Sequence, residues 1–394
     1  MTSLERSLRA EPRARGRLLE RVAVAILERA LAHLEGGTLE VELPDGSVRR
    51  FGSGAPVRLS IHDRRFFRRI ATRGKLGLGE SYTAGEWSSD DLPAFFELLL
   101  VNAEAAAERH ARVRRLLEAR PRTNRRNGLG RARRNIAYHY DLGNELFAAM
   151  LDETMTYSCA VFEREDEALA DAQLRKLRRV CDKLGLGPGD HLLEIGCGWG
   201  SFARVAAGEY GARVTGLTIS AEQARVARAR TAGLDVEIRE QDYRKVDGSF
   251  SKVASIEMLE AIGDRQYGAF FATIDRVLRP GGLACVQTIL VPDRRWPRYR
   301  KTPDWIERYV FPGCLIPSLA ALTRSMARHS RLGVRDLEEI GPHYAETLRR
   351  WRTRFHESPA REERFERTWD FYLAYCEAAF RTGSLHDAQL VLAR

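Results

Sequence analysis

The sequence lacks the features that mark several classes of protein. Its 394 residues include six cysteines, with no CxxC pair and no cysteine and histidine at metal-ligand spacing, which argues against a disulfide framework and a structural zinc site. No stretch approaches the roughly 18 consecutive apolar residues of a membrane span. The charged N-terminus contains no apolar segment typical of signal peptides. We therefore expect a cytoplasmic protein without a bound metal.

Basic residues are in excess, and the formal net charge is +10. Such a charge favours an anionic partner, either nucleic acid or an acidic membrane surface, although a generally arginine-rich composition explains it equally well. Arginine, glycine and asparagine are concentrated in residues 119–135. This composition predicts a basic linker between domains, either a solvated tether or a loop that meets an anion.

Residues 1–118 predict a small α+β domain. Apolar residues at helical spacing in residues 16–34 indicate an amphipathic helix. The alternating segment that follows is centred on Pro44-Asp45-Gly46 and is typical of a β-hairpin. Two further helical patterns, in residues 66–87 and 91–117, complete the domain.

From Asp190 onward, short apolar runs alternate with helical stretches. The runs are HLLEIG, RVTGLT, VEIREQD, KVASIEM and LACVQTIL, and HDAQLVLAR is the candidate for a last strand. This alternation predicts an α/β domain, residues 136–394, with a doubly wound, Rossmann-like parallel sheet. Residues 291–329 interrupt the pattern and are expected to shape a substrate pocket.

A glycine-rich turn, Glu194 to Gly200, joins the first of these strands to its helix. Ligands of doubly wound sheets lie at the carboxyl ends of the strands. The chain contains no GxxxxGK[ST] phosphate loop, and the turn departs from the dinucleotide pattern GxGxxG. Its form, ExGxGxG, resembles the first motif of the class I S-adenosylmethionine-dependent methyltransferases. That resemblance implies that Glu194, Gly196, Gly198 and Gly200 meet the methionine part of the cofactor.

The same resemblance assigns the rest of the cofactor site. Asp242 would meet the adenine amino group, next to Gln241 and Tyr243. The second strand ends in GLTIS without the acidic residue that usually binds the ribose hydroxyls. Gln223, together with Thr218 and Ser220, is expected to bind the ribose instead, because a glutamine side chain both donates and accepts hydrogen bonds.

Several motifs in order resemble one family, the cyclopropane-fatty-acyl-phospholipid synthases. They are YHYDLGN (138–144), YSCA (157–160), EIGCGWGSFA, GLTISAEQ, SIEMLEAIG, RYVFPG, GPHYAETLRRW and YLAYCEAAF, and the similarity runs from about residue 60 to the C-terminus. The resemblance implies transfer of a methyl group from S-adenosylmethionine to the double bond of a phospholipid acyl chain. Tyr157 and Ser158 would then close over the cofactor.

The reaction that this family catalyses forms a carbocation, which must lose a proton to a nearby base. In the family this base is thought to be a bound bicarbonate. Glu260 would accept a hydrogen bond from the bicarbonate hydroxyl and Tyr344 would donate one to it. The remaining residues that the resemblance places around bicarbonate are His139, the backbone of Cys159, Ile289 and Cys376.

One position departs from the family pattern. Gln287-Thr288-Ile289 stands where family synthases commonly have His-Thr-Ile. A glutamine can donate a hydrogen bond to bicarbonate but cannot titrate. The sequence therefore does not decide how the cation loses its proton, and it leaves two products as alternatives. One is a cyclopropane, and the other is a methylene branch that a reductase converts to a methyl branch.

The expected partners are an unsaturated phospholipid and the anionic surface of a membrane. Residues 1–118, the linker and the WPRYR segment (Trp296 to Arg300) supply cationic and aromatic groups for peripheral binding at the inner face of the membrane. A homodimer is one alternative for the oligomeric state. Two other classes remain as alternatives. One is an RNA methyltransferase, but the sequence lacks the Asn/Asp-Pro-Pro-Tyr/Phe motif of enzymes that methylate base amino groups. The other is a non-catalytic paralogue that binds lipid, but the chain retains Cys159, Glu260 and Tyr344.

Overall fold

The structure is a computed structural model that describes residues 24–25, 28–29, 31–109, 144–302 and 304–394. The predicted linker and most of the predicted helix at residues 16–34 lie outside these ranges. The chain divides into two compact units. Unit 1 comprises Met1–Arg120, Pro303–Trp305 and Ala360–Thr382, and unit 2 comprises Pro121–Thr302, Ile306–Pro359 and Gly383–Arg394.

Unit 1 contains a four-stranded sheet in the order β2-β1-β3-β4. Its elements are β1 (Thr38–Glu42), β2 (Val48–Gly52), β3 (Pro56–Ile61), α2 (Arg65–Arg73), α3 (Lys75–Thr83), β4 (Trp87–Ser89), α4 (Leu92–Arg109) and α16 (Glu363–Arg381). The predicted hairpin is confirmed, since β1 and β2 pair antiparallel with Thr38 opposite Gly52. Gly46 in its turn has a φ of 81°, which glycine adopts without strain.

Helix α16 packs against α3 and α4 within unit 1. Its apolar face meets an aromatic core that includes Trp87, Phe95 and Phe96, each at most 2% exposed. The Tyr82 hydroxyl donates a hydrogen bond to Asp370 Oδ2 at 2.6 Å. Residues 360–382 therefore share a core with the N-terminal elements, whereas the sequence pattern groups them with residues 136–394.

Unit 2 is built on a seven-stranded sheet in the order β10-β11-β9-β8-β5-β6-β7. The strands are β5 (His191–Ile195), β6 (Arg213–Thr218), β7 (Val236–Glu240), β8 (Phe250–Ile256), β9 (Leu278–Leu290), β10 (Gly333–Glu339) and β11 (His386–Ala393). Strands β5 to β9 pair parallel, and β11 pairs antiparallel with both β9 and β10. The predicted doubly wound sheet and its last strand are confirmed.

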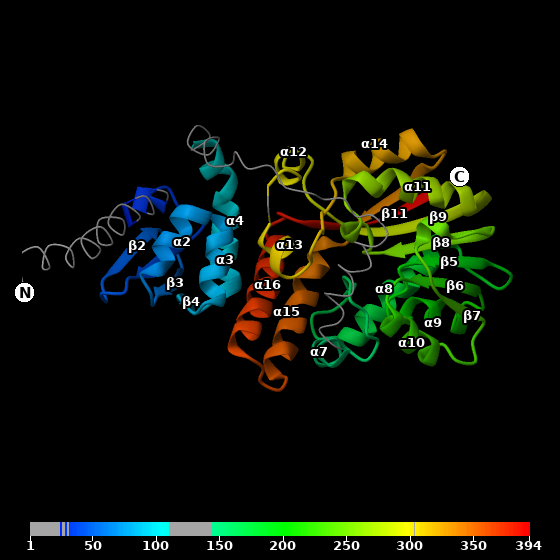
Figure 1. Ribbon diagram of the computed structural model, residues 1–394, viewed down its shortest axis with the longest axis horizontal. Helices are drawn as coiled ribbons and strands as arrows, with labels where there is room; N and C mark the ends of the chain where they lie inside the picture. The colour runs from blue at the N-terminus through cyan, green and yellow to red at the C-terminus, as the bar shows by residue number, and fades with distance from the viewer. Residues whose placement is uncertain (1–23, 26–27, 30, 110–143, 303) are drawn as a thin grey trace, which may run out of the picture. The chain divides into compact units, whose positions relative to one another are not determined.

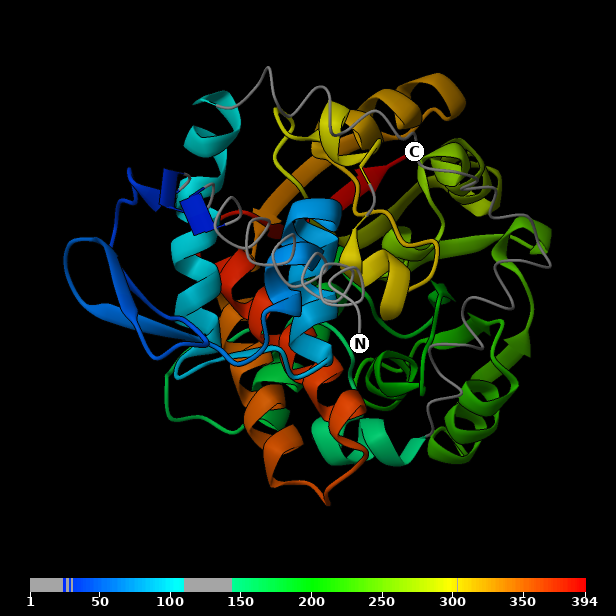
Figure 2. The same ribbon diagram turned by 60° about the vertical axis from the view of Figure 1, so that its left-hand side comes forward.

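Helices cover both faces of this sheet. The remaining helices of the described chain are α7 (Asn144–Met150), α8 (Leu169–Leu184), α9 (Ser201–Gly208), α10 (Ala221–Arg230), α11 (Tyr267–Val277), α12 (Trp296–Tyr299), α13 (Trp305–Tyr309), α14 (Leu319–His329) and α15 (Gly341–Glu357), of which α13 begins at Trp305 of unit 1. Figures 1 and 2 both show α9 and α10 on one face and α11 and α14 on the other. On each face, a separate cluster of buried apolar side chains packs between the strands and the helices.

Strand β5 lies in the interior of the sheet, between β6 and β8. The chain runs outward from β5 through β6 to β7 and then returns to form β8 on the other side of β5. Such a reversal leaves a crevice at the carboxyl ends of the two central strands, and ligands of doubly wound sheets bind there. The glycine-rich turn follows β5 and the SIEMLEAIG segment follows β8, so both motifs meet at this crevice.

Candidate active site

The three glycines of the turn after β5 all have a left-handed backbone. The φ values are 87° at Gly196, 51° at Gly198 and 86° at Gly200. A Cβ on Gly196 would lie 3.0 Å from Met258 Cγ, and one on Gly200 would lie 3.1 Å from Ala227 Cα, so a side chain there would crowd its neighbours. A Cβ on Gly198 would meet no atom within 4 Å. The backbone at Gly198 is thus open to the approach of a ligand.

Glu194 is buried at the end of β5, with 3% of its surface exposed. Burial raises the pKa of its carboxyl group to about 8, and a hydrogen bond with the backbone of Ala203 opposes that rise. Its Oε2 atom has no hydrogen-bond partner among the residues described. A buried carboxyl group with an open acceptor beside the glycine turn is suited to a polar ligand.

The residues expected to bind the ribose form one hydrogen-bonded group after β6. The Thr218 hydroxyl donates to Gln223 Oε1 at 2.8 Å. The Ser220 hydroxyl accepts a hydrogen bond from the Gln223 backbone N–H at 3.3 Å and so caps α10. The orientation of the Gln223 amide is therefore fixed before any ligand binds.

The residues expected to bind the adenine are brought to the end of β7. Asp242 Oδ2 forms an ion pair with Arg244 at 2.6 Å, which lowers the pKa of Asp242 against the opposing effect of burial. The Gln241 side chain donates to the Lys245 carbonyl at 2.8 Å. Tyr243 is buried, and its hydroxyl has no hydrogen-bond partner within the described part of the chain. The structure thus places these three residues together, and their role with adenine stays a prediction.

The YSCA segment lies against α8 and the end of β8. Lys176 of α8 is fully buried and donates from Nζ to the Ser158 hydroxyl at 2.5 Å. Gln173 donates to the Ser158 carbonyl at 2.8 Å. The backbone N–H of Cys159 donates to Glu257 Oε1 at 2.8 Å. The segment is therefore held in place by buried side chains of one helix and by one carboxylate.

Three carboxyl groups gather where β8, β9 and β11 meet: Glu257, Glu260 and Asp387. Glu260 Oε1 accepts hydrogen bonds from the Thr288 hydroxyl at 2.7 Å and from the Ile289 N–H at 2.6 Å. Asp387 is opposite Ile289 in the β9–β11 register, because β11 begins where β9 ends. The carboxyl ends of β8 and β9 lie beside the start of β11, and this arrangement brings the three carboxyl groups together.

Gln287 joins two of these carboxyl groups. Its Nε2 donates to Glu257 Oε1 at 2.8 Å and to Asp387 Oδ2 at 3.1 Å. Its Oε1 accepts a hydrogen bond from Gln389 at 3.1 Å, which fixes the amide orientation. The Tyr344 hydroxyl, on the first turn of α15, donates to Glu257 Oε2 at 2.6 Å.

The electrostatics of this cluster favour protonation of two of its members. Burial, followed by the charge of Glu257, raises the pKa of Glu260 to about 7. The same two causes raise the pKa of Asp387 well above its ordinary value. Burial lowers the pKa of Lys176, and the charge of Glu257 partly restores it. The cluster can therefore hold and exchange protons near neutral pH.

Aromatic rings line the region between the YSCA segment and α15. Tyr157 lies 5.2 Å from Phe147 and 5.2 Å from Trp351, measured between ring centroids. Phe147 lies 5.1 Å from Trp199, the residue between the second and third glycines of the turn. Tyr344 lies 6.0 Å from Trp351. Such rings can stabilise a cation through their electron-rich faces.

For two predicted residues, a place in this cluster stays a prediction. His139 lies outside the described residues. Cys376 is buried on α16, which belongs to unit 1. Conversely, the site includes Glu257, Asp387 and Lys176, which were not expected from the sequence. Glu257 had one available signal, since an acidic residue directly after a strand of a doubly wound sheet lies at the ligand-binding edge.

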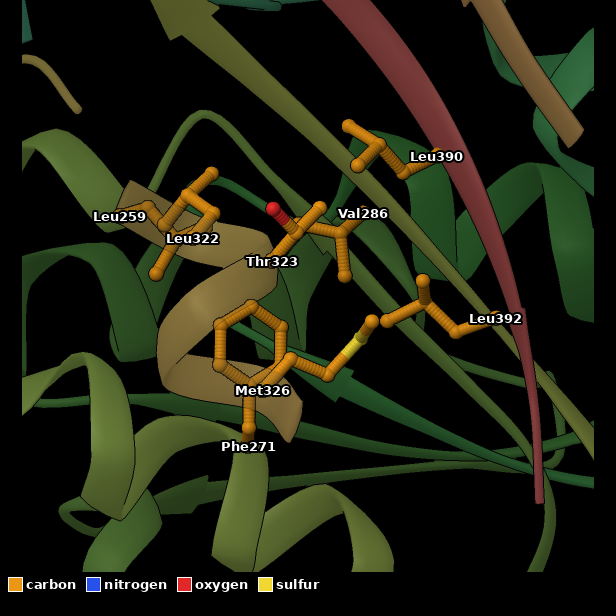
Figure 3. Close-up of a pocket in the computed structure, with 8 residues that line it drawn as sticks. All are labelled: Leu259, Phe271, Val286, Leu322, Thr323, Met326, Leu390 and Leu392. Carbon is orange, nitrogen blue, oxygen red and sulfur yellow. The ribbon is translucent and has the colours of Figure 1, made fainter. Parts of the chain in front are cut away.

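A small apolar cavity lies between α11, α14 and the sheet of unit 2. Its lining residues are Leu259, Phe271, Val286, Leu322, Thr323, Met326, Leu390 and Leu392. Figure 3 shows the side chains of α14 turned toward those of β9 and β11. Seven of these residues belong to the apolar cluster on this face, so the cavity is a gap in the core.

Other binding features are few in the described ranges. No group of three or more His, Cys, Asp or Glu side chains there is arranged to hold a metal ion. None of the helices described is both long and apolar enough to cross a membrane. Five of the six cysteines are buried and all six are free thiols.

Comparison with known proteins identifies the family. The mycolic acid cyclopropane synthetase family matches residues 128–390. The tuberculostearic acid methyltransferase UfaA1 of Mycobacterium tuberculosis is 41% identical over 392 residues, which cover 95% of this chain and 91% of that protein. The cyclopropane-fatty-acyl-phospholipid synthase of Escherichia coli K12 is 36% identical over 377 residues, covering 90% of this chain and 96% of that protein.

The fold agrees with this assignment. The crystal structure of mycolic acid cyclopropane synthase CmaA1, complexed with SAH and CTAB, superposes with a TM-score of 0.62 at 30% sequence identity. The match covers 66% of this chain and 98% of that one. Together with the glycine turn at the switch point of the sheet, these similarities show that the chain belongs to the mycolic acid cyclopropane synthetase family of S-adenosylmethionine-dependent methyltransferases.

Proposed function

We propose that the protein transfers a methyl(ene) group from S-adenosylmethionine to the double bond of unsaturated phospholipid acyl chains, giving a cyclopropane. The observation that carries the proposal is the joint position of an open glycine turn, a set of aromatic rings and a hydrogen-bonded carboxylate cluster at one crevice. Each of the three supplies a different need of this reaction: a cofactor site, stabilisation of a cation and acceptance of a proton.

The described residues fit S-adenosylmethionine. The open space at Gly198 is where a side chain would block a ligand, and the buried Glu194 Oε2 and Tyr243 hydroxyl are polar atoms without partners among the described residues. When bound, the cofactor supplies an activated methyl group. The Gly196 to Gly200 backbone would hold its methionine part and the Gln223 amide its ribose.

The aromatic rings and the carboxylates act on the lipid. Methyl transfer to an alkene requires close alignment of the reacting atoms, which a rigid pocket provides. The product cation would lie near Tyr157, Trp351 and Tyr344, whose ring faces are favourable for positive charge. A carboxylate of the cluster then accepts the proton that the cation must lose.

Bicarbonate is the base that family resemblance suggests, and the donors present do not fit it. The Cys159 N–H, the Gln287 amide and the Tyr344 hydroxyl all donate to Glu257. The Ile289 N–H donates to Glu260. Because these groups already donate to carboxylates, bicarbonate would have to displace a carboxylate to bind them.

A methylene-branched or methyl-branched product is the alternative outcome of the same chemistry. The 41% identity to a protein named as a tuberculostearic acid methyltransferase favours this alternative, and the 36% identity to a protein named as a cyclopropane synthase favours the ring. The two products differ in whether a hydride shifts before the proton is lost.

The lipid substrate implies peripheral binding at an anionic membrane surface, at the cytoplasmic inner face. Within the WPRYR segment, Arg298 and Arg300 are exposed, while Trp296 packs against the apolar cluster of unit 2. Electrostatic attraction by arginines is therefore the main contribution we propose for this segment. A homodimer is compatible with this mode of binding.

One experiment separates the proposed function from its alternatives. The purified protein is incubated with methyl-labelled S-adenosylmethionine, unsaturated phospholipid vesicles and total RNA in one reaction. Label in the acyl chains supports the proposal. Label in RNA would support an RNA methyltransferase, and label in neither fraction would support a non-catalytic lipid-binding protein.

A further inference from the structure

Glu257 accepts hydrogen bonds from three groups of the active site. Its Oε1 accepts from the Cys159 N–H and from Gln287 Nε2, both at 2.8 Å. Its Oε2 accepts from the Tyr344 hydroxyl at 2.6 Å. These are the donors that the family resemblance would otherwise assign to bicarbonate. A carboxylate and a bicarbonate ion present the same planar pair of oxygens, so one can replace the other in such a set of donors.

The backbone at Glu257 carries strain. Among the described residues, it is one of two non-glycine residues with positive φ, at 49°. A side chain in this conformation is unfavourable, and glycine would adopt it without strain. The conformation is held by the Glu257 N–H, which donates to the Gln287 carbonyl at 2.8 Å. Strained residues concentrate at functional sites because the surrounding structure must hold them there.

The charged neighbours of Glu257 lie on β11, on the loop after β8 and on α8. Asp387 of β11 shares a hydrogen bond with Glu257, and its raised pKa favours the protonated form. Glu260 of the same loop has a pKa raised to about 7. Lys176 of α8 interacts with Glu257 across the buried interior. The two carboxyl groups beside Glu257 thus favour their protonated forms, while the Glu257 oxygens accept hydrogen bonds from the Cys159 N–H, Gln287 and Tyr344.

We propose that the Glu257 carboxylate is the proton acceptor of the reaction and occupies the place of a bicarbonate ion. This inference rests on the proposed function. After the methyl group bonds to one alkene carbon, the other carbon is cationic. Glu257 takes a proton from the transferred methyl group, and the electron pair of the broken C–H bond closes the ring onto the cationic carbon. If a hydride first shifts from the methyl-bearing carbon to the cationic carbon, the same electron pair forms the double bond of a methylene branch. The proton then passes to solvent, which restores the carboxylate.

The proposal is tested with three forms of the full-length protein. Wild type, Glu257→Gln and Glu257→Gly are assayed with methyl-labelled S-adenosylmethionine and unsaturated phospholipid vesicles, with and without bicarbonate. Wild-type turnover should be the same in both buffers. Glu257→Gln should lose about 100-fold or more, the contribution of a general base. Glu257→Gly folds without strain and vacates the donors, so added bicarbonate should restore part of its activity.

A matched control is the substitution Glu209→Gln. Glu209 is a surface carboxylate outside the site, and it forms an ion pair with Arg178 at 2.6 Å. The turnover of this variant should equal that of wild type in both buffers. Wild-type turnover that falls on removal of bicarbonate and returns on its addition would overturn the proposal. Full turnover by Glu257→Gln would overturn it as well.

A second measurement does not depend on lipid turnover. Bicarbonate, compared with chloride at equal ionic strength and pH, should raise the unfolding temperature of Glu257→Gly and leave that of wild type unchanged, because a ligand stabilises only a protein that binds it. Equal effects on the two proteins would overturn the proposal. If wild type labels no lipid in either buffer, the proposed function fails, and this measurement still decides whether Glu257 fills an anion site.

Discussion

Replacement of Gly198 by alanine should separate cofactor binding from folding. The φ of 51° places Gly198 in the left-handed region, where an alanine costs about 1–2 kcal/mol of folding stability. The new methyl group would meet no protein atom within 4 Å and would project into the space assigned to the cofactor. Overpacking by one methyl group costs about 1–3 kcal/mol, which corresponds to roughly a 5- to 150-fold rise in the Kd for S-adenosylhomocysteine.

Gly185 provides the matched control for this substitution. It ends α8 with a φ of 56°, and a Cβ there would likewise meet no atom within 4 Å. Gly185→Ala should therefore lose a similar free energy of unfolding, measured in urea, while titration calorimetry finds an unchanged Kd. An unchanged Kd in Gly198→Ala, or an equal rise in both variants, would refute the reasoning.

Three further predictions concern the carboxylates and the membrane. Glu260→Gln should keep S-adenosylhomocysteine affinity in calorimetry but lose most label transfer, because the carboxylate orients the cluster; wild-type turnover would contradict its role. Burial raises the pKa of Glu194 to about 8. The protonated carboxyl group therefore stabilises the folded state fully when the pH is below the ordinary pKa of glutamate, and this stabilisation is lost as the pH rises toward 8. Glu194→Gln should thus gain unfolding free energy relative to wild type between pH 5 and 8, by up to about 1.4 kcal/mol per pH unit, and a constant difference in urea unfolding would contradict this. Vesicle sedimentation should increase with anionic lipid and decrease with salt; equal binding to neutral vesicles would exclude the electrostatic contribution.

The central strands and the glycine turn could be predicted because their signals are local. A buried parallel strand is rich in apolar and β-branched residues, and β5, β6 and β8 each contain a short run of them. Strand β10 could not be predicted in this way. It is an exposed edge strand, GVRDLEE, held by backbone pairing to β11 and by Lys183, whose Nζ lies 2.5 Å from Asp336 and 3.0 Å from Glu338. Its pairing depends on chain segments far away in sequence.

The same limit applies to the active site. The sequence identified Glu260 by its place in a motif, and the structure brings it next to Ile289. Glu257 lies three residues earlier in the same motif, and its importance depends on a positive φ that a non-glycine residue rarely adopts. Asp387 meets Gln287 only after the last strand inserts antiparallel beside β9. These contacts are decided by tertiary structure, and no local pattern encodes them.

The most direct test of the account is mass spectrometry of the acyl chains after reaction. The purified protein is incubated with S-adenosylmethionine carrying a ¹³C methyl group and with a phospholipid that has one cis double bond. The account predicts that this acyl chain gains one ¹³C-labelled CH₂ unit, and NMR of the product then distinguishes a cyclopropane from a methylene branch. An unmodified acyl chain in the presence of turnover of S-adenosylmethionine, or label on the headgroup, would contradict it.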